Sequence, residues 1–149
     1  MNLRIYADTS VIGGCLDAEF RDESIALLNM VRRGEAVLLV SSHLVQEIAD
    51  APPEVREVLA SLPDEHLERL NVTDEALVLQ AAYLQAAIVG PAAADDALHV
   101  ALATVGRADL IVSWNFRHIV HFDKIRRFNA INRFHGYQGV DIRSPREVI

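Results

Sequence analysis

The chain has 149 residues, of which 51% are hydrophobic, and a formal net charge of −7. This length gives one domain that can bury a core, so we expect a single domain over residues 1–149, and the composition excludes a disordered protein. The single cysteine, Cys15, excludes an internal disulfide and suits a reducing compartment. No apolar run reaches the roughly 18 residues of a membrane span, and no signal-peptide core is present. We therefore expect a cytoplasmic protein without membrane association.

The charge is distributed unevenly along the chain. A net negative charge argues against nucleic-acid binding, but residues 107–149 hold eight Lys and Arg residues against four Asp and Glu residues. This C-terminal third is suited to contact phosphates, while the acidic remainder is suited to hold a metal ion. An alternative that stays open is that the basic stretch 124–127 is only a solvated face.

Apolar runs alternate with helical patterns. In chain order, the patterns predict a strand at 3–7, a helix at 24–33, a strand at 36–40, helices at 43–49 and 54–62, an ambiguous strand at 67–72, helices at 74–89 and 92–105, and strands at 109–113 and 137–142. The strands lack a two-residue alternation, as strands covered on both faces do. This order predicts an α/β fold with a mostly parallel sheet.

Four oxygen-bearing residues lie at corresponding places in this pattern. Asp8 directly follows the first strand, and Asn115 follows the strand at 109–113 by two residues. Glu47 and Asp96 lie early in the helices at 43–49 and 92–105. In parallel sheets, ligands bind at the carboxyl ends of the strands, so all four are expected at one edge. Carboxylates that meet repel one another, and a cluster of them indicates a Mg²⁺ or Mn²⁺ site.

Each of these residues alone has an ordinary explanation. Asp8 could cap a helix, Glu47 could be a solvated helix residue, and Asn115 could be a turn residue. The pair Asp95 and Asp96 could be favourable charges at a helix start. Four coincidences at compatible positions favour a site over these alternatives. Adjacent residues are about 100° apart on a helix, so only one of the pair faces the site; we choose Asp96.

At these residues the sequence resembles a known family. The ordered set of Asp8-Thr9-Ser10, Glu47, the stretch Asp96-Ala97-Leu98-His99-Val100-Ala101-Leu102-Ala103 and Ser113-Trp114-Asn115-Phe116-Arg117-His118 is similar to PIN domains, in particular to VapC-type toxins and their bacterial relatives. The resemblance implies a three-layer α/β/α fold, a metal-dependent ribonuclease and a small antitoxin partner. It assigns Asp8, Glu47 and Asp96 as the acidic residues. Asn115 stands where many relatives have Asp or Asn, and His118 stands near the place of another acid.

These considerations predict a Mg²⁺-dependent endoribonuclease that hydrolyses RNA phosphodiester bonds as the toxin of a type II toxin–antitoxin pair. Asp8 and Asp96 are expected to ligate the metal directly, Glu47 to act through water or at a second metal, and Asn115 to orient a water or offer its carbonyl oxygen. One firmly held metal is expected, with a second recruited by the substrate. The Ala-rich helices suggest a homodimer. Two alternatives stay open: a catalytically weak RNA-binding or scaffold module, and a solitary PIN nuclease without an antitoxin.

The six histidines form no zinc-binding motif in the sequence. His99, three residues after Asp96, is expected to be a packing histidine, and Trp114 is expected to pack rather than to stack on a base. Both are left out of the catalytic set.

Overall fold

The computed structural model describes residues 2–149 and contains one five-stranded sheet. The strands lie in the order β3-β2-β1-β4-β5, and every neighbouring pair is parallel. They are β1 (Leu3–Ala7), β2 (Ala36–Ser41), β3 (Leu67–Leu70), β4 (Leu110–Val112) and β5 (Asp141–Arg143). The predicted parallel α/β sheet is confirmed, and the ambiguous stretch at 67–72 does contain a strand.

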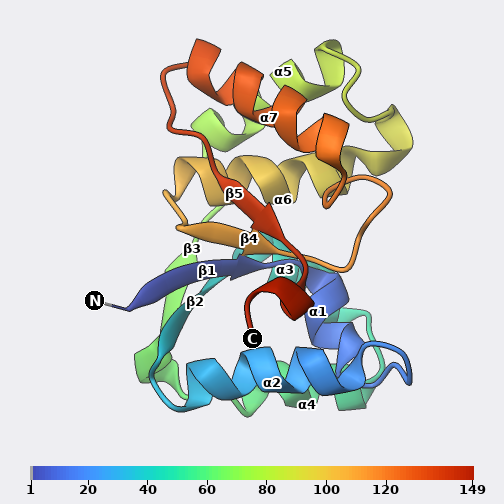
Figure 1. The fold of residues 1–149 in the computed structure, drawn as a ribbon, viewed down its shortest axis with the longest axis vertical. Coiled ribbons are helices and arrows are strands. Elements are labelled where there is room, and N and C mark those ends of the chain that lie inside the picture. The colour runs from blue at the N-terminus through green and yellow to red at the C-terminus, as the bar shows by residue number, and fades with distance from the viewer. Residues whose placement is uncertain (1) are drawn as a thin grey trace.

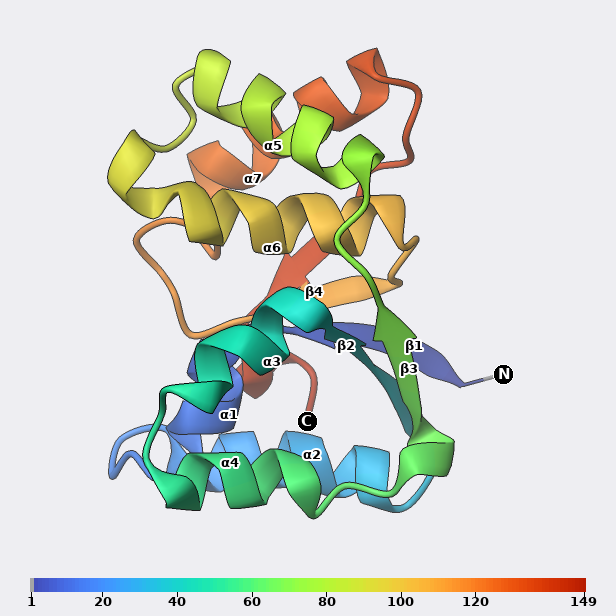
Figure 2. The same ribbon diagram turned by 180° about the vertical axis from the view of Figure 1, so that it is seen from behind.

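Helices cover both faces of the sheet. One layer holds α1 (Thr9–Gly14), α2 (Arg21–Arg32), α3 (Ser42–Ala49) and α4 (Pro53–Ala60); the other holds α5 (Asp74–Gln85), α6 (Ala94–Val105) and α7 (Phe122–Phe134). In Figure 1 and Figure 2, α6 lies directly on the sheet, and α5 and α7 pack on the side of α6 that faces away from the sheet. Short 3₁₀ helices span Asp64–His66, Pro91–Ala93 and Pro145–Glu147. None of the helices described within residues 2–149 is both long and apolar enough to cross a bilayer.

Successive strand residues enter two separate cores. Tyr6 and Leu39 belong to the core under α5, α6 and α7, whereas their neighbours Ile5 and Leu38 belong to the core under α1 to α4. All four side chains are at most 1% exposed. Because both faces are covered, the three central strands β1, β2 and β4 carry apolar residues at nearly every position, whereas the edge strands β3 and β5 include charged residues.

The end of α5 differs from the prediction. The helix was expected to continue to residue 89, but it ends at Gln85. Ala87 adopts a left-handed conformation with φ of 55°, and the Ile88 N–H donates to the Tyr83 carbonyl at 3.2 Å. This is a Schellman termination, in which glycine is the usual left-handed residue. The alanine at position 87 does not indicate the end of a helix in the sequence. The apolar Ile88 fits the pattern of a continuing helix, although in the structure it packs into the core.

Helix α7 was not predicted, because polar residues occupy part of its buried face. Phe128 is fully buried, but Asn129 and Asn132 are buried beside it. The Asn129 side chain donates to the Val140 carbonyl at 3.0 Å and accepts from the Val140 N–H at 2.8 Å. The Tyr83 hydroxyl donates to Asn132. Asparagine thus holds the segment before β5 against α7, and it interrupts the apolar stripe by which helices are recognised in a sequence.

Part of the basic stretch 124–127 has a structural role. Lys124 Nζ donates to the Ile88 carbonyl at 3.2 Å, and Arg127 donates to the Ala86 carbonyl at 2.8 Å. These carbonyls follow the last turn of α5, where cationic donors are favourable. Arg126 is exposed and lies over the Phe122 ring. Two of the predicted phosphate-binding cations therefore bind backbone carbonyls of their own chain.

Replacing Asn129 with Ala should destabilise the protein by about 2 kcal/mol, because the buried N–H and carbonyl of Val140 would both lose their partner. Urea unfolding followed by circular dichroism measures this loss. Arg126→Ala, on the exposed face of the same helix, is the matched control and should change stability by less than about 0.5 kcal/mol. Equal stability of the two variants would contradict this role of Asn129.

Candidate metal centre

Asp8 is the most buried carboxylate of the predicted site, with 4% exposure. It occupies the N-cap position of α1, but its side chain makes no capping hydrogen bond. Instead, Oδ1 accepts from the Ser10 hydroxyl at 2.5 Å and Oδ2 accepts from the Ser113 hydroxyl at 2.8 Å. Ser113 directly follows β4, the neighbour of β1 in the sheet. The carboxyl ends of two adjacent strands therefore meet at Asp8, and the simple capping explanation does not apply.

The two serine hydroxyls are themselves oriented by the backbone. Ser10 Oγ accepts from the Trp114 N–H at 2.9 Å, and Ser113 Oγ accepts from the Asn115 N–H at 2.9 Å. Because each oxygen already accepts a backbone proton, its own hydroxyl proton is free to point at Asp8. Both carboxylate oxygens are thereby held in fixed positions.

The electrostatic environment of Asp8 is unfavourable for its charge. Burial raises the pKa of Asp8; the Ser10 hydrogen bond, His99 and Ser113 oppose this shift, and the negative charge of Asp96 adds to it. None of the ion pairs formed within residues 2–149 includes Asp8 or Asp96. Two carboxylates whose charges act on each other, and which form no ion pair among the described residues, fit an oxygen-ligated divalent cation.

The neighbouring acids Asp95 and Asp96 face different surroundings. Both lie in the first turn of α6. Asp96 is half-buried and its charge acts on Asp8, whereas the Asp95 side chain is 72% exposed and its Oδ1 lies 3.3 Å from His43 Nε2. Asp96 is therefore the better placed of the two to share a cation with Asp8, and it remains our predicted ligand.

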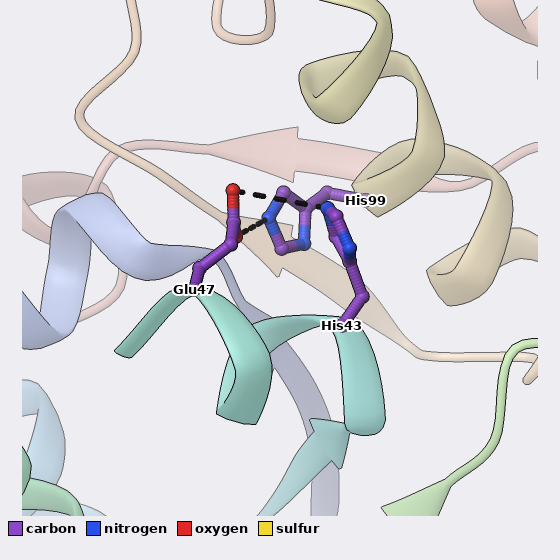
Figure 3. A group of neighbouring side chains, drawn as sticks. All are labelled: His43, Glu47 and His99. Atoms are coloured by element: carbon purple, nitrogen blue, oxygen red, sulfur yellow. Dashed lines mark hydrogen bonds and ion pairs between the residues drawn. The ribbon is translucent and has the colours of Figure 1, made fainter. Parts of the chain in front are cut away.

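Glu47 is held by partners other than the two aspartates. Its Oε1 accepts from the Thr9 hydroxyl at 2.6 Å and lies 2.6 Å from His99 Nε2, while Oε2 lies 3.7 Å from His43 Nε2 (Figure 3). Burial tends to raise the pKa of Glu47, but the hydrogen bonds from His99 and Thr9 outweigh it, so the pKa lies below its ordinary value. Glu47 is an ionised carboxylate, joined to the Asp8 segment through Thr9.

Asn115 takes part in a turn. Its Oδ1 accepts from the His118 N–H at 2.9 Å, which closes the turn that follows β4. The residue lies at the predicted edge of the sheet, but its side-chain oxygen already has a backbone partner. Its predicted role in orienting a water stays a prediction.

Sequence reasoning missed the histidine partners of Glu47. His99 is 2% exposed, so it is a packed histidine as expected, but it also contacts the site through Glu47. Helical spacing was the available signal: His43 lies four residues before Glu47, and His99 lies three residues after Asp96. The predicted packing role of Trp114 is confirmed, because the side chain is 5% exposed, stacks on Phe20 and donates to Ser24.

The family follows from comparison with known proteins. Residues 4–117 match the family model of the PIN domain, so the chain belongs to the PIN domain family. No curated protein matches it.

Solved structures share the fold over nearly the whole chain. VapBC2 from Rickettsia felis, bound to a DNA fragment from their promoter, aligns with a TM-score of 0.60 and 13% identity over 95% of this chain and 98% of that chain. DNA-bound VapBC from Salmonella typhimurium aligns with a TM-score of 0.57 and 18% identity, over 96% and 98% of the two chains. FitAcB from Neisseria gonorrhoeae aligns with a TM-score of 0.57 and 18% identity, over 95% of this chain and 97% of that chain. The predicted three-layer PIN-like fold is confirmed.

Asp8→Asn should stabilise the metal-free protein, because it removes a buried charge and keeps oxygen and nitrogen atoms for the two serines. We expect the melting temperature in EDTA to rise by at least about 2 °C, the shift that about 1 kcal/mol gives in a chain of this size. Since the folded-state pKa is raised, the wild type loses stability as pH rises from the ordinary value of 3.8. The advantage of the variant should therefore disappear as the pH falls to that value. Thermal melts at several pH values measure it, and a less stable variant at neutral pH would contradict it.

Proposed function

We propose that this protein is a Mg²⁺-dependent endoribonuclease, also served by Mn²⁺, of the VapC type. The observation that carries the proposal is the buried Asp8 carboxylate, which two serine hydroxyls fix, on which the charge of Asp96 acts, and which takes part in none of the ion pairs within residues 2–149. Asp8 and Asp96 would hold the ion directly, and Glu47 would act through water or at a second ion. Membership of the PIN domain family supports the same assignment.

The chain's own residues would arrange the reaction as follows. A bound divalent ion supplies a water of lowered pKa and stabilises the negative charge that develops on the phosphate. Ser10 and Ser113 hold the Asp8 carboxylate in one orientation, so the site needs little reorganisation when the cation and RNA bind. The hydrogen bonds from His99 and Thr9 keep the Glu47 carboxylate ionised. Arg117 and Arg126 are exposed cations of the C-terminal third and are available to RNA phosphates.

A small antitoxin is the partner that we propose, with the protein acting in the cytoplasm. The shared fold with the VapBC structures supports such a pair. A groove of about 320 Å³ between α3, α4 and β3 offers an apolar surface; its lining residues include Val45, Ile48, Leu59, Leu62 and Leu67. Leu77 and Val78 are exposed on α5 and support the predicted homodimer. Purification of the protein with the product of a neighbouring short gene would separate this proposal from a solitary nuclease.

Asp8→Asn and Asp96→Asn should each reduce Mg²⁺-dependent RNA cleavage to the background level, because each removes one of two charged oxygen ligands. Cleavage of a long single-stranded RNA, with and without Mg²⁺, measures this. Asp95→Asn is the matched control on the same helical turn and should retain cleavage. Circular dichroism confirms that the variants are folded. Full activity in either of the first two variants would overturn the assignment.

The same assay tests the alternative of a catalytically weak module. The turn bond of Asn115 and the histidine at position 118 favour that alternative, since neither residue offers a further carboxylate. Mg²⁺ binding by the wild type without RNA cleavage would support it.

A further inference from the structure

Three metal-ligating side chains converge beside the Asp8 site. His43 and Glu47 are one turn apart on α3, and His99 comes from α6. One ligand atom from each of them lies within 4.8 Å of the other two. Figure 3 shows the two imidazoles and the carboxylate facing one another between the helices. Two nitrogen ligands and one carboxylate form a set that Zn²⁺ and similar transition metals accept.

The ring of His99 is oriented by buried partners. Its Nδ1 lies 2.6 Å from the Tyr6 hydroxyl, which lies 2.9 Å from the Ser41 hydroxyl. Tyr6 and Ser41 are fully buried. A hydroxyl can both donate and accept, so this chain supports His99 with its proton on either ring nitrogen. Outer partners of this kind fix the ring orientation of histidines that bind metals.

His43 presents a nitrogen with no hydrogen-bond partner among the described residues. Its Nε2 is buried from solvent, yet it lies 3.3 Å from the Asp95 carboxylate and 3.7 Å from that of Glu47. A buried polar atom without a partner is costly, whereas a metal ion bound to Nε2 and Glu47 would satisfy both groups. The nearby charge of Asp95 further favours a cation at this place.

We propose that His43, Glu47 and His99 bind one transition metal ion of the Zn²⁺ class, at a position separate from the Asp8–Asp96 cation site. When the metal ion binds Nε2, the single proton of the neutral His99 ring lies on Nδ1 and is donated to the Tyr6 hydroxyl, so the ring changes tautomer and no proton has to leave. Mg²⁺ prefers oxygen ligands, so it does not compete at two imidazoles. The triad shares Glu47 with the proposed nuclease site, but the inference does not require nuclease activity, because it concerns metal binding by these three side chains.

Isothermal titration of the metal-free full chain with ZnCl₂, in the presence of excess MgCl₂, tests the proposal. The wild type should bind one equivalent of Zn²⁺. His43→Gln should weaken binding by at least about tenfold, whereas His135→Gln, an exposed histidine at the end of α7, should leave it unchanged. Asp8→Asn should also leave Zn²⁺ binding intact, which separates this site from the proposed Mg²⁺ site.

X-ray absorption of the zinc-loaded wild type provides a measurement that does not depend on the folding of a variant. The spectrum of the wild type should show two imidazole ligands around the zinc ion, and the spectrum of His43→Gln should show one. Absence of stoichiometric Zn²⁺ binding, or equal affinity in His43→Gln, would overturn the proposal and leave the triad as a hydrogen-bonded support for Glu47. Loss of Zn²⁺ binding in Asp8→Asn would contradict the separation of the two sites. A failure to cleave RNA would alter none of these outcomes.

Discussion

The structure depends on one electrostatic conflict, the placement of the Asp8 carboxylate in the interior next to a second carboxylate. A buried charge needs partners, and this chain supplies neutral ones. Two hydroxyls orient the carboxylate, but none of the ion pairs within residues 2–149 includes it. Such an arrangement is less stable than an apolar one would be, and it persists where a bound cation completes it. The buried charge of Asp8 is thus the structural feature on which the proposed metal-dependent activity rests.

The residues around this conflict divide into two groups that share one short segment. The Ser10 hydroxyl donates a hydrogen bond to Asp8. Thr9, which lies between Asp8 and Ser10 in the chain, donates its hydroxyl hydrogen bond to Glu47 instead. The first turn of α1 therefore links an all-oxygen environment on one side with an imidazole environment on the other. This division follows from the sheet, because α1 starts at the end of β1 between the ends of β2 and β4. The hydroxyl contacts of Asp8 and the histidine contacts of Glu47 therefore lie near one another but involve different side chains.

The sheet, and the place of Asp8 at the carboxyl end of β1, could be predicted from the sequence, because both follow from local patterns and from the rule that parallel strands share a carboxyl edge. The end of α2 was signalled by Gly34, which adopts a φ of 75°. The end of α5 has the same geometry but uses Ala87, so the sequence carried no signal there. The histidine contacts of Glu47 were missed for another reason. They join α3 to α6, and which face of each helix meets the other is decided by packing over long sequence separations.

The hydrogen bonds around Ser10 give the single tryptophan a further significance. Trp114 donates its backbone N–H to Ser10 Oγ, and that hydroxyl donates to Asp8. Its indole is fixed separately, by Ser24 and by stacking on Phe20. The only indole chromophore of the chain thus belongs to a residue two hydrogen bonds from the carboxylate. The protein carries its own fluorescent reporter of what happens at Asp8.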